Sequence, residues 1–179
     1  FLIEGAQRIR ATGADSIFVY LTFGGSNNSM DIYPDYDQDL WSDQPVSSLV
    51  ELAQTTPFQQ LFAIPFSTYV LTTYSSAIPY PLQVTSYSDE DFSQERAQFY
   101  ALTRYLLQTY EGQGKTFILK HWEGDSIVAT HHGGASSPDW NAEMDTTEQL
   151  QLIKWLQSRQ EGVEEARASL NGVSDVQVL

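Results

Sequence analysis

The stretch Gly112-Gln113-Gly114-Lys115-Thr116-Phe117-Ile118-Leu119-Lys120-His121 decides the fold, because it joins a helix to a strand through only three residues. Upstream of it, Ser88 and Asp91 form a capping pair at the start of an amphipathic helical pattern. The two glycines stop that helix, since glycine readily adopts the left-handed conformation found at helix ends. The continuous apolar run 116–121 is typical of a strand that is covered on both faces.

The same succession of helix and strand recurs along the whole chain. Helices are predicted for residues 1–12, 47–57, 88–110 and 145–170, and strands for 16–21, 61–71, 116–121 and from Val176 onward. Asp145 and Glu148 form a capping pair at the start of the last helix. Pro65 interrupts the second strand, so we expect regular pairing to lie on one side of it. Such alternation indicates crossover units and a parallel sheet.

The connecting segments differ in length according to their direction. Helix-to-strand connections take about three residues, whereas strand-to-helix connections take about 15 to 25, against a usual range of roughly 2 to 6. Because parallel strands send these long segments to one side, we expect that side to carry the function. A complete (β/α)₈ barrel takes about 250 residues. We therefore expect residues 1–179 to form one partial (β/α)₈ TIM-barrel domain, about half of it, truncated at both ends; a flavodoxin-like open sheet is the alternative.

Composition excludes several classes of partner. Nine Lys and Arg residues face 23 Asp and Glu residues, and the net charge of -14 repels nucleic acid and anionic lipid surfaces. No apolar run reaches the roughly 18 residues that a membrane span needs. The chain has no cysteine, so thiolate metal sites are not available. The sequence leaves the oligomeric state open.

Glu123 is the candidate catalytic residue. It follows the strand that ends at His121, where a rigid scaffold can hold a side chain over a cleft. A carboxyl group that is next to an indole and near a lysine, here Trp122 and Lys120, can act as a general acid or base. Glu123 can equally cap a turn or pair with Lys120, and the residues alone do not separate these roles.

The run from Gly5 through 115–125 to Trp155-Leu156 and Arg159-Gln160 resembles a group of poorly characterised secreted microbial proteins that are similar to TIM-barrel glycoside hydrolases. The resemblance covers nearly the whole chain. In the large retaining clan of that fold, the acid/base glutamate ends strand four and the nucleophile ends strand seven. The resemblance therefore implies a secreted carbohydrate-active hydrolase without a cofactor, with Glu123 as acid/base and an oligo- or polysaccharide as its partner.

Two features depart from the clan pattern. The residue before the glutamate is usually asparagine, where this chain has Trp122, and strand seven would lie beyond Leu179. The second carboxylate that glycoside hydrolysis requires is therefore not identified here. The alternative function is a non-catalytic glycan-binding or structural barrel protein.

Aromatic and polar residues in the long segments complete the predicted sugar site. Aromatic rings stack on the apolar faces of sugars, although aromatic residues in loops also pack those loops against the core. The residues that we predict to bind substrate are Tyr33, Trp41, Tyr74, His121, Trp122, Asp125 and Trp140.

The pair His131-His132 is the one suggestion of a metal ligand set. Adjacent histidines project in different directions, and Asp139 does not complete a convincing ligand spacing. The sequence therefore predicts no metal site. Gly24-Gly25 lacks the further glycine and the helix start of a dinucleotide-binding motif.

Overall fold

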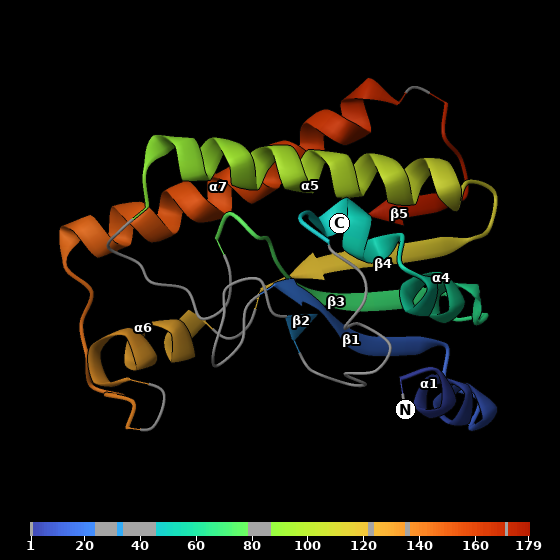
Figure 1. Ribbon diagram of the computed structural model, residues 1–179, viewed down its shortest axis with the longest axis horizontal. Coiled ribbons are helices and arrows are strands. Elements are labelled where there is room, and N and C mark those ends of the chain that lie inside the picture. The colour runs from blue at the N-terminus through green and yellow to red at the C-terminus, as the bar shows by residue number, and fades with distance from the viewer. Residues whose placement is uncertain are drawn as a thin grey trace.

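The computed structural model describes residues 2–23, 32–33, 46–78, 87–121, 124–134, 137–170 and 172–179, and it shows an α/β fold (Figure 1). The sheet has the strand order β2-β1-β3-β4-β5. Its strands are β1 (Ser16–Phe23), β2 (Ile32–Tyr33), β3 (Thr68–Tyr74), β4 (Lys115–Lys120) and β5 (Val176–Val178). The predicted parallel sheet is confirmed, since β1, β3, β4 and β5 all pair in parallel; only the short β2 is antiparallel, at the edge beside β1.

The four parallel strands follow one another across the sheet in chain order. Among the described strands this order does not reverse, whereas a flavodoxin-like sheet reverses at its switch point. The arrangement is compatible with part of a parallel α/β fold in which each strand lies beside its predecessor.

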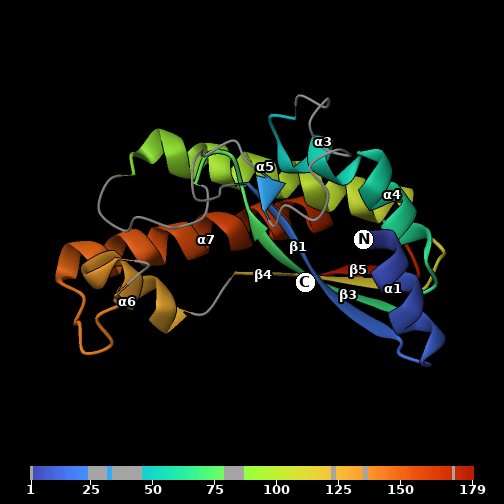
Figure 2. The ribbon, with the colours of Figure 1, turned by 60° about the horizontal axis from the view of Figure 1, so that its bottom comes forward.

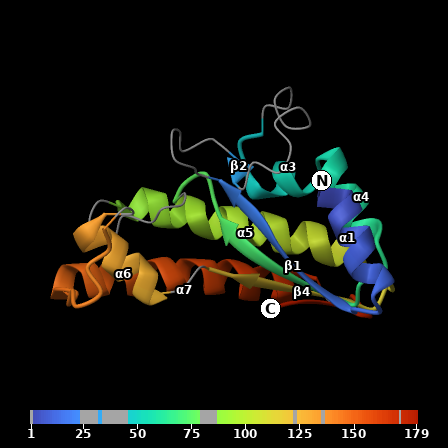
Figure 3. The same cartoon turned by 90° about the horizontal axis from the view of Figure 1, so that it is seen from below.

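The helices are α1 (Leu2–Ala11), α3 (Leu49–Ala53), α4 (Thr56–Ala63), α5 (Asp89–Thr109), α6 (Gly124–Gly133) and α7 (Thr146–Ser169). Figure 3 shows the sheet in front of the long helices α5 and α7, which lie side by side. Gly162 allows this close packing, because a Cβ there would clash with the backbone oxygen of Arg96. The main core fills the space between the sheet and these helices, with Leu21, Phe62 and Phe117 fully buried.

Local signals placed most helix ends correctly. Capping boxes begin α5 at Ser88 and α7 at Asp145, as predicted. Ser48 caps α3, and Gly13 follows α1 with a φ of 93°.

Three sequence predictions are corrected by the structure. The predicted strand 61–71 begins only at Thr68, because residues 61–63 end α4, with Pro57 in its first turn. Backbone N–H groups in the first helical turn have no partner within the helix, so proline, which lacks this group, is tolerated there. Pro57 therefore lies at the start of a helix, where we expected one to end. The segments 22–45 and 122–145, expected to be loops, contain β2 and α6.

The two faces of the sheet differ in their exposure. Side chains of β1 that point toward the helices, such as Val19 and Leu21, are buried. Phe18, which points to the opposite face of the sheet, is 44% exposed. Phe18 pairs with Val70, which pairs with Ile118, and the latter two are half-buried. An apolar row therefore crosses the face opposite the long helices.

Candidate functional site

The carboxyl ends of three parallel strands lie at one edge of the sheet, where the sequence placed the candidate site. Near the end of β1, Thr22 pairs with Tyr33 of β2 on one side and with Tyr74 of β3 on the other. At the end of β4, Lys120 pairs with Thr72. The backbone of β2 and the ends of β3 and β4 therefore meet along a common edge.

Several predicted site residues fall outside the described part of the chain. His121, which directly follows β4, is described and half-buried. Two residues connect it to Gly124, the first residue of α6. The predicted residues outside the description are Trp41, Trp122 and Glu123, together with the side chains of Tyr33 and Asp125.

Tyr74 packs into the protein rather than lining an open surface. Its side chain is 1% exposed, and its ring stacks on Trp155 of α7 at 5.7 Å between centroids. The ring of His121 lies 5.6 Å from the same indole. Trp155 therefore joins the ends of β3 and β4, and Tyr74, the last residue of β3, packs against α7.

A buried charged network lies beneath this edge. Glu95 of α5 is fully buried and accepts hydrogen bonds from the hydroxyl of Ser75 and from Nε1 of Trp155, the latter at 2.9 Å. Nη1 of Arg159 lies 3.4 Å from Oε1 of Glu95 and donates to the backbone oxygen of Thr73 at 2.8 Å. The network therefore ties α5 and α7 to the end of β3.

Burial dominates the electrostatics of the pair. It raises the pKa of Glu95, and the charge of Arg159 together with the hydrogen bonds from Ser75 and Trp155 opposes that rise. Burial likewise lowers the pKa of Arg159, against the attraction of Glu95. The guanidinium also packs on the ring of Phe99, 4.1 Å from its centroid. The surrounding groups thus enclose both charges.

The exposed predicted residue lies after α6, in the described range 137–170. Figure 1 places α6 beyond the tip of β4, on the side of the carboxyl ends. Trp140 follows α6 and is 63% exposed. Of the predicted aromatic residues whose side chains are described, Trp140 is the one that presents its ring to solvent.

The structure also gathers three potential metal ligands on this side. Nε2 of His131 and Nε2 of His132, at the end of α6, each lie 3.1 Å from Oε1 of Glu148 in α7. The three ligand atoms all lie within 4.8 Å of one another. Glu148 is 3% exposed, whereas the two histidine side chains are 20% and 32% exposed.

The sequence did not predict this group because its third residue, Glu148, also caps a helix. Glu148 was identified only as a capping residue, and its Oε2 does accept from the backbone N–H of Asp145 at 2.7 Å. Asp139, which we considered as a third ligand beside the histidines, instead accepts a hydrogen bond from the backbone N–H of Asn141. The sequence signal that was available is Glu148, a carboxylate residue at the start of the helix that follows the histidine pair.

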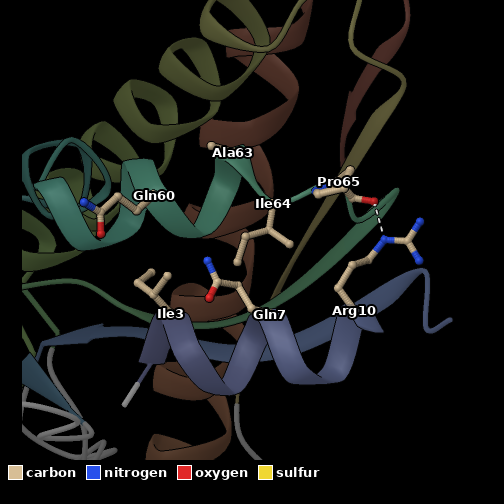
Figure 4. Close-up of a pocket in the computed structure, with 7 residues that line it drawn as sticks. All are labelled: Ile3, Gln7, Arg10, Gln60, Ala63, Ile64 and Pro65. Carbon is tan, nitrogen blue, oxygen red and sulfur yellow. Dashed lines mark hydrogen bonds between the residues drawn. The ribbon is translucent and has the colours of Figure 1, made fainter. Parts of the chain in front are cut away.

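A separate cleft of about 650 Å³ lies between α1 and α4 (Figure 4). Ile3 and Gln7 of α1 line it, and Nε of Arg10 donates to the backbone oxygen of Pro65 at 2.9 Å across one end. Pro65 precedes β3, so this cleft lies near the amino ends of the strands. It is therefore distant from the edge that carries His121.

No protein-family model, curated protein or solved structure matches the chain. None of the helices in the described ranges combines the length and the apolar character that crossing a membrane requires. The geometry of the site is therefore the basis on which a function is proposed.

Proposed function

We propose that the chain is part of a (β/α)₈ barrel that hydrolyses glycosidic bonds at the carboxyl ends of its strands. The observation that carries this proposal is the set of four parallel strands in chain order, with the carboxyl ends of β1, β3 and β4 at one edge. Enzymes built on parallel barrels have their active sites at that edge.

The apolar row on the second face of the sheet supports the barrel. A parallel sheet is normally covered on both faces. In a closed barrel, the row of Phe18, Val70 and Ile118 would point into the barrel and pack against side chains from the other strands. Phe18, which is 44% exposed in this chain, would then be buried in the complete barrel.

Glu123 is the residue to which we assign the general acid and base. It comes two residues after His121, at the end of β4, and a barrel strand before β1 would make β4 the fourth strand. Exposed Trp140 offers a ring that can stack on a sugar. The nucleophilic carboxylate would come from a later strand.

Replacing Glu123 in the full-length protein tests this assignment. We expect Glu123→Gln to lower kcat about 10²- to 10⁴-fold on unactivated glycans, the usual contribution of general acid–base catalysis. On aryl glycosides whose leaving group needs no proton, the first step should lose much less. Initial rates on a glycan panel and on such aryl glycosides measure both effects.

The matched control is Glu111→Gln, because exposed Glu111 lies between α5 and β4, at the opposite edge of the sheet. Its rates should equal those of the unmodified protein. Unchanged activity of Glu123→Gln would remove Glu123 from the mechanism. Glycan binding without any hydrolysis by the unmodified protein would favour the non-catalytic alternative.

A further inference from the structure

We propose that His131, His132 and Glu148 form a binding site for a divalent transition-metal ion, with zinc as the expected occupant. Both imidazole Nε2 atoms lie 3.1 Å from Oε1 of Glu148. Ligand atoms that surround a tetrahedral zinc ion at 2.0–2.1 Å are about 3.3 Å apart. Two of the three separations therefore already match those around a zinc ion, and the third is no more than 4.8 Å.

The types of donor select the class of metal. Two imidazole nitrogens and one carboxylate oxygen suit zinc and neighbouring transition ions, whereas calcium and magnesium prefer sites made wholly of oxygen atoms. A cation between these groups interacts with a lone pair of each of the three ligand atoms, whereas a single proton can join only two of them. The same three ligand types hold zinc in sites where a fourth position stays open to water.

The backbone around the histidines is built to hold them in place. Gly133 packs so closely on the segment after α6 that a Cβ would clash with the backbone nitrogen of Asp139. That nitrogen donates to the backbone oxygen of Ala129 at 2.9 Å, and Gly134 then turns the chain with a φ of 79°. The motif His131-His132-Gly133-Gly134 thus supplies two ligands, a close contact and a turn.

The carboxylate is equally well oriented. Glu148 lies in the first turn of α7, and its Oε2 accepts from the backbone N–H of Asp145 at 2.7 Å. Its Oε1 faces both histidines, and Nε2 of His132 also lies 3.2 Å from Oε2. Hydrogen bonds of this kind, which fix a ligand through its second atom, raise metal affinity.

The position of the site connects it to the rest of the molecule. α6 lies beyond the carboxyl end of β4 (Figure 1), and α7 carries both Glu148 and the buried Trp155. In Figure 2, α6 lies beside the first turns of α7. A bound ion would fasten α6 to α7 at the edge of the sheet where we place substrate.

Titration of the metal-free chain with zinc chloride in a calorimeter tests the proposal. We expect one zinc ion per chain to bind and to raise Tm, while magnesium and calcium chloride do neither. His131→Ala, His132→Ala and Glu148→Gln should each weaken zinc binding by at least about 10- to 100-fold, since losing even an outer partner of a ligand has this effect.

Two control variants separate the site from its surroundings. Asp91 occupies in α5 the same capping-box position that Glu148 occupies in α7, so Asp91→Asn removes a comparable charge without a neighbouring histidine pair. His121→Ala removes the third histidine of the chain. Both should bind zinc as the unmodified protein does, and circular dichroism should show all variants folded without metal.

The outcomes decide the proposal in both directions. Absence of stoichiometric zinc binding to the unmodified chain would overturn it. So would binding that persists in His131→Ala, His132→Ala and Glu148→Gln alike, because the ion would then be held elsewhere on a chain with a net charge of -14. Binding that is lost in these three variants and kept in both controls would establish the site. Because none of these measurements involves a glycan, their result is independent of the role assigned to Glu123.

Discussion

Two glutamates with similar burial have very different neighbours. Glu95 and Glu148 are 0% and 3% exposed, and each has two nitrogen atoms within 3.4 Å of its Oε1. Glu95 faces the indole of Trp155 and the guanidinium of Arg159, which are themselves buried. Glu148 faces two imidazoles that water reaches.

This difference separates a structural role from a ligand-binding one. Glu95 of α5 contacts Ser75, directly after β3, and Trp155 and Arg159 of α7, so the buried network joins these three elements. The groups around Glu148 come from α6 and α7 and leave one side accessible. Both carboxylates are buried, so what separates them is whether the groups that contact them are also buried. A carboxylate whose neighbours are exposed can receive a ligand.

Removing the charge of Glu95 should produce the largest effect. We expect Glu95→Gln to lower the free energy of unfolding by about 3–5 kcal/mol, because the change leaves the guanidinium of Arg159 buried without its countercharge. Glu148→Gln should cost only about 1 kcal/mol, the usual value for weakening a helix cap. Urea unfolding followed by circular dichroism measures both.

A double variant shows whether the charge pair is the cause. Combining Glu95→Gln with Arg159→Met removes both charges, and replacing a buried pair with uncharged residues is often neutral. The double variant should therefore be more stable than Glu95→Gln alone. Equal losses in both single glutamate variants would contradict the distinction between the two carboxylates.

The second test acts on the backbone that positions the histidines. We expect Gly133→Ala to lower the free energy of unfolding by about 1–3 kcal/mol, the usual effect of overpacking, because the added methyl group meets the backbone of Asp139. It should also weaken zinc binding, since the end of α6 must move. Denaturant unfolding and calorimetric titration measure the two effects.

Gly5→Ala is the matched control for this substitution. Gly5 lies inside α1, and an added Cβ would meet nothing within 4 Å. Alanine there should be neutral or stabilising by up to about 1 kcal/mol, because glycine disfavours helices. If Gly133→Ala behaved like Gly5→Ala and kept its zinc affinity, the close approach would not be what holds the histidines.

Local chemistry explains which elements the sequence could predict. The capping pairs of α5 and α7 involve residues three apart, and the glycines at 13, 112 and 172 all have positive φ. The apolar run 61–71 was ambiguous because a short buried helix and a buried strand have the same hydrophobicity. Pro57, which starts a helix as readily as it follows one, did not resolve it.

The place of the site in the fold was predictable from the alternation of helices and strands, whereas its side-chain contacts were not. Parallel alternation correctly placed the ends of β3 and β4 at one edge. The Glu95–Arg159 pair joins residues 64 apart, and His132 and Glu148 are 16 apart on different helices. Glu95 does lie three residues after Phe92 on the apolar side of its helix, but its partner depends on how α5 and α7 pack.

The smallest effect should come from an exposed ion pair between the same two long helices. Nζ of Lys154 in α7 lies 3.0 Å from Oδ1 of Asp89 in α5, which is closer than Arg159 is to Glu95, but the side chains are 51% and 92% exposed. We expect Lys154→Gln to change the free energy of unfolding by no more than about 0.5 kcal/mol, because water and salt screen exposed charges. Urea unfolding at low and high salt measures this, and the small difference should vanish at high salt. A loss comparable to that of Glu95→Gln would mean that distance, and not enclosure, sets the strength of the contacts between α5 and α7.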